Sequence, residues 1–411
     1  MSPPIHPESN LYKLNVKRPS LLTLIVLISF GSIGAALFTP AIPTIISAFE
    51  ISVSTAQLTV TLYLLGYCIG QLFYSPLAKR YGRKPTLYFG ISVALIGSLF
   101  CALAGPLHSF RLLLIARLVM SLGSSVGLSL TFLIISDYFY EKHARKITAY
   151  TMLAFAVVPG VSIAIGGVLV TYLPWESCFY FLTVYAFFAL YLVYRLDETG
   201  PGKEKAATRL SIVIKHYRRD FKNPVLLIYS ILIGSSTAFV YVFAATAPII
   251  VISRMGIRPD VFGLFNLIPA TGYFLGNFVA ARLANHFETK TVLHWGLALM
   301  GVGVVILFIL FWSGMRTPLT VFLPVSLLYF GIPLMYSNAA VLATFRVKDK
   351  PNASSIMSFI NIGSAVIGIL MIESIPGSPG RVLTALFFGI FLFMIGLYLL
   401  CYKRLTDDQE T

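Results

Sequence analysis

Long runs of apolar residues, separated by short polar turns, fill most of this chain. A run of roughly 20 apolar residues can cross the ~30 Å hydrocarbon core of a bilayer as a helix. The runs are unbroken, without the alternation that barrel strands show, so they predict helices. Twelve spans are expected near 21–43, 56–78, 86–105, 110–135, 147–171, 176–196, 224–252, 261–284, 290–312, 318–344, 353–375 and 381–402. The predicted fold class is an all-α integral membrane protein with twelve transmembrane helices.

One stretch of the second span returns half a chain later. The sequence GYCIGQ at 66–71 comes back as GYFLGN at 272–277, an offset of 206 residues. At the same offset Tyr81 is matched by Phe287 and Lys84 by Lys290. A single repetition in the same direction predicts two six-helix bundles that face each other across a central cleft. The expected parts are a tail (1–20), a first bundle (21–196), a linker (197–223), a second bundle (224–402) and a short tail (403–411).

Basic residues are distributed unevenly over the turns between these spans. If both termini are cytoplasmic, 25 of the 31 Lys and Arg residues lie on the inner side and 5 on the outer side. The positive-inside bias therefore supports twelve spans with both termini in the cytoplasm. Much of the inner charge lies in the polar linker, where an amphipathic helix near 208–220 and a plain charged tether are both compatible with the sequence.

Composition excludes several classes of protein. Hydrophobic residues make up 57% of the chain and charged residues 11%, which no soluble domain matches. The net charge of +15 decorates one side of a membrane, so a nucleic-acid partner is not expected. The four cysteines lack paired spacing and the six histidines are dispersed, so neither a metal site nor an enzyme's catalytic cluster is predicted. No phosphate-binding loop or other cofactor motif is present, and an ion or substrate gradient is the expected energy source.

The turn between the second and third spans carries the most specific motif. It reads SPLAKRYGRKP at 75–85 and resembles the cytoplasmic-loop motif of the major facilitator superfamily. Arg80, Gly82 and Arg83 match that motif, whereas Lys79 stands where the family has an aspartate. In the family this acid is thought to latch the loop against the other half. A lysine cannot accept such a bond, so the latch here must be weaker or built differently.

Other stretches resemble one branch of that superfamily. LFTPAIP at 37–43, AQLT at 56–59 and PWE at 174–176 are similar to the bicyclomycin-resistance-type drug:proton antiporters. The resemblance implies a monomeric multi-pass protein of the bacterial inner membrane that exports drug-like or amphipathic molecules in exchange for protons. Two departures concern coupling: Ala36 takes the place of the branch's acid in the first span, and Ser162-Ile163 takes the place of a glycine–proline pair in the fifth.

Charged residues within or beside the spans are the candidates for coupling and gating. Arg117 lies about two turns into the fourth span, and a charge at that depth is costly unless it is paired. It also matches a buried arginine that the family resemblance associates with proton coupling. Asp137 and Glu373 are the acids that touch a span, and His294 is a further titratable group. The candidate set is Arg117, Lys79, Arg80, Gly82, Arg83, Asp137 and Glu373.

Neutral polar residues on the spans are the candidates for the substrate cavity. Tyr63, Tyr67 and Gln71 share one stripe of the second span. Phenols and amides in an apolar span need partners, so they should face the bundle interior, either joining helices or contacting cargo. Such a lining suits a bulky amphipathic small molecule better than an inorganic ion. The full set is Tyr63, Tyr67, Gln71, Tyr241, Asn266, Tyr273, Asn277, Tyr336, Asn338 and Asn361.

Other functions remain open on the sequence alone. A transporter could instead import or export one specific metabolite, such as a siderophore-like chelate. An integral-membrane enzyme would need polar catalytic residues gathered at one membrane face. A receptor or scaffold would leave the repetition at 206 residues without a purpose.

Overall fold

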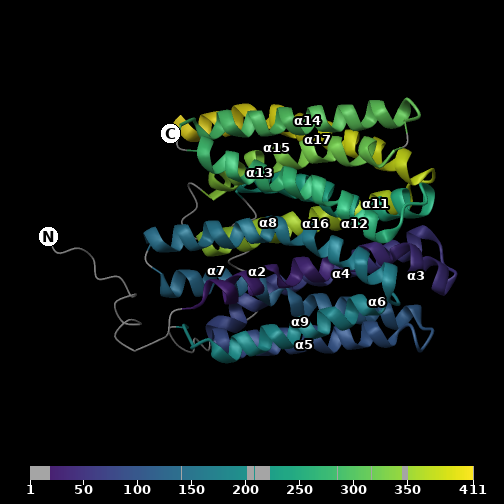
Figure 1. The fold of residues 1–411 in the computed structure, drawn as a ribbon. Helices are drawn as coiled ribbons and strands as arrows, with labels where there is room; N and C mark the ends of the chain where they lie inside the picture. The colour runs from purple at the N-terminus through teal and green to yellow at the C-terminus, as the bar shows by residue number, and fades with distance from the viewer. Residues whose placement is uncertain are drawn as a thin grey trace.

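The computed structural model describes residues 19–139, 141–200, 208, 223–284, 286–315, 317–344 and 350–410. Every regular element within these ranges is a helix (Figure 1). The N-terminal elements are α2 (Leu21–Ala36), η1 (Thr39–Ala41), α3 (Ile42–Phe49), α4 (Val53–Tyr81), α5 (Arg83–Leu103), α6 (Phe110–Ser124), α7 (Val126–Tyr138), α8 (Glu141–Tyr172) and α9 (Ser177–Arg195). The C-terminal elements are α11 (Pro224–Pro248), η3 (Ile249–Arg254), α12 (Pro259–Phe265), α13 (Leu267–Leu283), α14 (Thr289–Trp312), α15 (Pro318–Thr344), α16 (Lys350–Ser374) and α17 (Pro379–Glu410).

The all-helical membrane fold predicted from the apolar runs is confirmed. Within the described ranges, eleven helical segments are long and apolar enough to cross a membrane. A shorter apolar stretch, Val157–Tyr172 of α8, lies within the fifth span predicted from the sequence, at 147–171, and reaches one residue beyond it. Four spans are broken or bent, and their pieces carry separate labels: α2 to α3, α6 with α7, α11 with η3, and α12 with α13. The proposed amphipathic helix at 208–220 lies almost wholly outside the described residues.

The helices run side by side in two groups (Figure 1). We call α2 to α9 the N bundle and α11 to α17 the C bundle. The helices α5 and α9 lie at one edge, α14 and α17 lie at the opposite edge, and α4, α8 and α16 lie between them. The start of α2 and the end of α17 share one end of the molecule, which we call the terminal face. The opposite end, where α3 and the turn between α16 and α17 lie, is the distal face.

Local sequence explains where several helices begin. Ser20, Ser52, Ser109 and Asn223 each precede a helix, and each side chain accepts a hydrogen bond from an amide of the first turn. This contact satisfies a backbone donor that has no partner within the helix. These caps therefore help to set where α2, α4, α6 and α11 begin.

The repeated glycines pack equivalent helices in the two bundles. A Cβ on Gly66 of α4 would meet Ser121 of α6 and lie 2.8 Å from the Leu118 carbonyl oxygen. A Cβ on Gly272 of α13 would collide with Ser326 of α15 in the same way. The second and fourth spans therefore approach each other as the eighth and tenth do. This shared packing is the structural counterpart of the repetition in the sequence.

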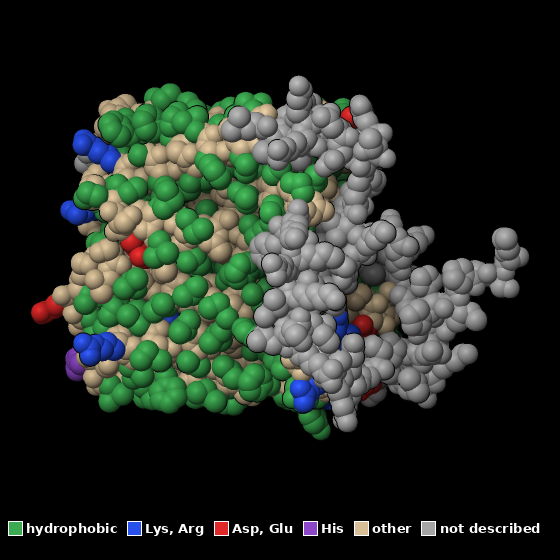
Figure 2. Space-filling view, turned by 180° about the vertical axis from the view of Figure 1, so that it is seen from behind, with side chains coloured by type: hydrophobic (Ala, Val, Ile, Leu, Met, Phe, Trp, Pro, Cys, Tyr) green, Lys and Arg blue, Asp and Glu red, His purple; other side chains and the backbone are tan. Residues whose placement is uncertain are grey.

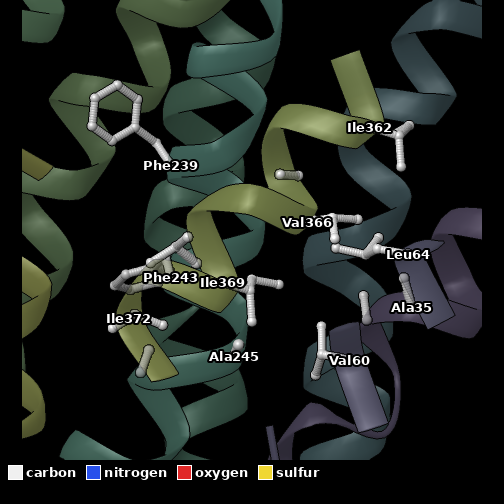
Figure 3. Close-up of a cluster of buried hydrophobic side chains, with 14 of the residues drawn as sticks. Ala35, Val60, Leu64, Phe239, Phe243, Ala245, Ile362, Val366, Ile369 and Ile372 are labelled. Carbon is white, nitrogen blue, oxygen red and sulfur yellow. The ribbon is translucent and has the colours of Figure 1, made fainter. Parts of the chain in front are cut away.

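The outer surface matches a lipid environment. Figure 2 shows hydrophobic side chains covering the flank of the described part, with charged side chains gathered towards its ends. Phe89, Tyr194 and Leu399 are among the large apolar residues exposed at the surface of the molecule. Beneath it, one apolar cluster includes residues of both bundles. There Leu64 of α4 lies beside Val366 of α16 (Figure 3).

Candidate functional site

Arg117 is fully buried inside the N bundle. Its Nη1 donates to the carbonyl oxygen of Gly34 at 2.8 Å, and its Nε donates to that of Thr59 at 3.1 Å. The guanidinium lies between two aromatic rings, 3.8 Å from the centroid of Phe38 and 4.1 Å from that of Tyr63. Arg117 thus ties α6 to α2 and α4.

The break in the first span explains how a buried cation is held without an acid. The helix α2 ends at Ala36, so the carbonyl of Gly34 belongs to its last turn, where carbonyls lack helical partners. The negative end of the helix dipole adds to the attraction of that carbonyl for a cation, and the two ring faces attract it as well. The Nη2 atom has no hydrogen-bond partner among the described residues.

Four predicted cavity residues meet where the two bundles face each other. Tyr67 of α4 lies near Tyr241 of α11 and Tyr336 of α15. Tyr273 of α13 lies near the same two residues. We call these four residues the central tyrosine cluster. They come from four helices and from both bundles, so the cluster lies at the interface that alternating access would open and close.

Several polar atoms in and beside the cluster have no hydrogen-bond partner among the described residues. Asn361 of α16 donates from Nδ2 to the Tyr336 hydroxyl at 3.2 Å. Within the described ranges, no partner reaches the Tyr67 hydroxyl, the Nε2 of Gln71 or the Oδ1 of Asn361. Buried polar atoms are normally paired, so unpaired ones mark places where a cargo or water can bind.

The remaining cavity candidates have other partners. Tyr63 donates its hydroxyl to the Gly31 carbonyl at 2.8 Å and covers Arg117. Asn277 and Asn338 donate to carbonyls of their own helices, at 3.0 and 2.8 Å. Asn266 marks the break between α12 and α13 and is buried. Tyr329, which the sequence reading omitted, packs its ring edge-on to Tyr273 at 6.2 Å.

At the terminal face the basic loop is held by an acid of its own bundle. Arg83 is buried and forms a two-point ion pair with Asp137 of α7, with N–O distances of 2.8 and 3.2 Å. Its Nη1 also donates to the Ala78 carbonyl at 2.9 Å. The two predicted residues Arg83 and Asp137 therefore lock the turn between α4 and α5 onto α7.

The linker supplies a second acid that the sequence reading did not single out. Glu198 accepts hydrogen bonds from the backbone amides of Arg83 (2.8 Å) and Lys84 (3.0 Å), capping the start of α5. Gly82, with φ of 100°, allows this approach, because a Cβ there would lie 2.6 Å from Oε2 of Glu198. In the sequence, the position of Glu198 just after the sixth span was the only indication that it could contact this loop.

The two other basic candidates in this loop differ in their contacts. Arg80 donates to the Thr208 hydroxyl at 2.6 Å, so it also holds the linker. Lys79 is exposed, and no hydrogen bond or ion pair joins it to another described residue. Lys79 stands where the family motif has an acid, and in the described part of the chain it makes no hydrogen bond or ion pair to the C bundle.

At the distal face the two bundles are joined directly. Thr61 of α4 donates to Oε1 of Glu373 in α16 at 2.6 Å, and Gln57 donates to Thr246 of α11 at 3.4 Å. Further along this face, Thr171 accepts from the amide of Asp260 at 3.0 Å. The described hydrogen bonds between the bundles thus lie at this end, apart from one from Cys68 at mid-helix. The distal side is closed.

His294 lies away from both the central cluster and the distal closure. It shares a 2.8 Å hydrogen bond with Tyr398, and the two line an apolar crevice of about 430 Å³ between α14 and α17. The helices α14 and α17, which line this crevice, lie at the edge of the C bundle away from the N bundle (Figure 1).

Comparison with known proteins agrees with this architecture. The family model of the Major Facilitator Superfamily matches residues 22–371. The chain is 24% identical to Multidrug resistance protein D of Escherichia coli over 89% of its own length and 92% of that protein. It is 23% identical to a bicyclomycin resistance protein homolog of Haemophilus influenzae, covering 94% of this chain and 96% of that one. In structure it resembles a xylose transporter from E. coli with a TM-score of 0.72 at 14% identity, covering 92% and 96% of the two chains.

These matches cover nearly the whole chain and nearly the whole of each relative. The resemblance drawn from the basic loop and the neighbouring motifs is therefore confirmed, as is the expectation of a multi-pass transporter in place of an enzyme. The chain belongs to the Major Facilitator Superfamily.

Proposed function

We propose that this protein exports drug-like or amphipathic small molecules across the bacterial inner membrane by proton-coupled alternating access. The names of two relatives, a multidrug resistance protein and a bicyclomycin resistance homolog, support this cargo class. We further propose that it acts as a monomer, with bundles 21–196 and 224–402 joined by the linker 197–223. We assign 1–20 to a tail before the first bundle; the residues that we expected to form a second tail, 403–411, continue α17 as a helix to Glu410.

The proposed class of cargo rests mainly on the central tyrosine cluster. Its rings offer flat apolar faces, while Tyr67, Gln71 and Asn361 offer unpaired hydroxyl and amide atoms. No acidic or basic side chain of the described part hydrogen-bonds to this group. A neutral aromatic molecule with its own donors and acceptors fits such a lining, because a fixed charge would be desolvated without a counter-charge.

The distribution of basic residues orients the protein. We assign the terminal face to the cytoplasm and the distal face to the outside, following the positive-inside bias. The observed closure at Thr61 and Glu373 then seals the outer side. An exporter in this state takes up cargo from the cytoplasm, and rocking of the bundles releases it outside.

The placement of the acids constrains proton coupling. Asp137 is paired with Arg83 at the terminal face, and Glu373 lies in the distal closure, so neither is at the central cluster. Because Ala36 replaces the acid that the antiporter branch has in the first span, we expect the proton coupling of a neutral cargo to be weaker than in that branch, so that part of its flux proceeds without a proton. A large pH change inside proteoliposomes on adding neutral cargo would contradict this expectation.

Flux through the purified protein in proteoliposomes tests the proposal. The probe is radiolabelled chloramphenicol, a neutral aromatic antibiotic, compared with the cation tetraphenylphosphonium. We expect saturable chloramphenicol movement that exceeds movement in protein-free vesicles, with the cation moved more slowly. Saturable movement of a ferric chelate alone would favour the alternative of a siderophore-like cargo.

A further inference from the structure

Glu373 is the carboxylate that crosses the distal interface. It lies in the last turn of α16, is half-buried, and accepts a 2.6 Å hydrogen bond from Thr61 of α4. Of the described carboxylates, it alone accepts a hydrogen bond from the opposite bundle. The bond exists only while the distal ends of α4 and α16 are together.

The surroundings of Glu373 are apolar or neutral. One turn away on α4, Gln57 makes the neighbouring bond between the bundles. Ile369 and Ile372 of α16 belong to the same buried apolar cluster as Val60 of α4 (Figure 3). The carboxylate therefore lies at the edge of the apolar contact that joins the two bundles on the distal side.

Among the described residues, no cation pairs with the carboxylate of Glu373. The elements around α16 are α4, α11, α15 and α17, and the distal halves of the first three contain only uncharged residues. Two of the bases at this end are Arg254, at the end of η3, and Arg381, whose guanidinium lies 5.7 Å from the ring centroid of Trp312. Neither forms an ion pair with Glu373 within the described part of the chain.

A charged carboxylate in this position opposes closure. Closing the distal face removes the group from water, and one hydroxyl donor does not replace the lost hydration. The protonated form avoids that cost and keeps the bond, because its carbonyl oxygen still accepts from Thr61. When the bundles separate, the group returns to water and can release its proton there.

We propose that Glu373 and Thr61 form a proton-controlled latch of the outer gate. Protonation from the outer solution stabilises the closed gate, and ionisation favours the open one. Because the same side donates and receives the proton, the latch responds to external pH without carrying protons across. This inference rests on the proposed alternating access and adds a regulating residue to it.

Distances between spin labels across the distal face test the latch. Labels on cysteines introduced at Ser47 of α3 and Ser378, before α17, report open and closed populations in a background without native cysteines. The protein is reconstituted in nanodiscs and measured from pH 5 to pH 9. We expect the open-to-closed ratio to rise with pH by up to about tenfold per unit, the limit for one proton.

Three variants separate the latch from other causes. Glu373→Gln should remain mostly closed and lose the pH dependence, because glutamine is neutral and still accepts from Thr61. Thr61→Val should keep the pH dependence with a larger open fraction at every pH. Glu50→Gln removes an exposed carboxylate of the same face and should behave like the parent protein.

Two outcomes would overturn the latch. One is a pH response in Glu373→Gln equal to that of the parent, and the other is an open fraction in the parent that does not change with pH. Failure of the proposed transport would look different: no variant would show an open population under any condition, and chloramphenicol flux would be absent.

Discussion

At the scale of single residues, Arg117 is a structural centre of the N bundle. Replacing it with alanine leaves the Gly34 and Thr59 carbonyls unpaired and opens a gap between Phe38 and Tyr63. We expect Arg117→Ala to lower the free energy of unfolding by roughly 2–4 kcal/mol and to abolish flux. Thermal unfolding in detergent, alongside flux in proteoliposomes, measures both effects.

A second arginine of α6 provides the matched control. Arg111 is exposed at the start of the helix, so Arg111→Ala should leave stability and flux close to those of the parent protein. An Arg117→Ala protein with unchanged unfolding temperature would show that its carbonyl contacts do not hold the three helices together.

Tyr63 and Tyr67 are one helical turn apart, and we expect removal of the hydroxyl to lower stability at Tyr63 but flux at Tyr67. Tyr63→Phe removes a hydrogen bond to Gly31 and should cost about 1 kcal/mol of stability. Tyr67→Phe removes a hydroxyl without a described partner, so stability should hold while chloramphenicol flux falls. Stability and flux are measured for both variants under identical conditions. Chloramphenicol flux in Tyr67→Phe equal to that of the parent protein would show that this hydroxyl does not contact the cargo.

At the scale of helices, the repeated glycines set the closeness of equivalent pairs. Gly66→Ala in α4 and Gly272→Ala in α13 each push a methyl group into the backbone or side chain of the facing helix. We expect each to cost about 1–3 kcal/mol of stability. Gly389→Ala in α17 is the control, because nothing lies within 4 Å of the added Cβ. Equal effects at all three positions would contradict close packing as the role of the repeat.

The helices could be predicted because each depends on a continuous stretch of sequence. The contacts of the site could not be predicted, because they join residues that are far apart in the sequence. An apolar run indicates a membrane span, and a charged residue inside such a run, such as Arg117, is easily recognised as a candidate functional residue. The partners of that charge depend on where α2 breaks, which the Pro40 region hinted at without fixing. Glu198 lies 115 residues from Arg83 and Glu373 lies 312 from Thr61, so only the folded arrangement pairs them.

At the scale of the whole molecule, two bundles enclose one central cluster and meet directly at the distal face. Rocking of the bundles must break the contact between Thr61 and Glu373 while the terminal ends approach. The two ends should therefore change in opposite directions. Independent motion of single helices would produce no such relation.

Paired distance measurements across both faces test this claim most directly. Spin labels at Ser47 and Ser378 report the distal side, and labels at Tyr81 and Phe287, which the repeat relates, report the terminal side. With chloramphenicol and a shift from pH 5 to pH 9, the account predicts a longer distal distance together with a shorter terminal one. Distances that both stay fixed, or that lengthen together, would contradict alternating access by rocking bundles.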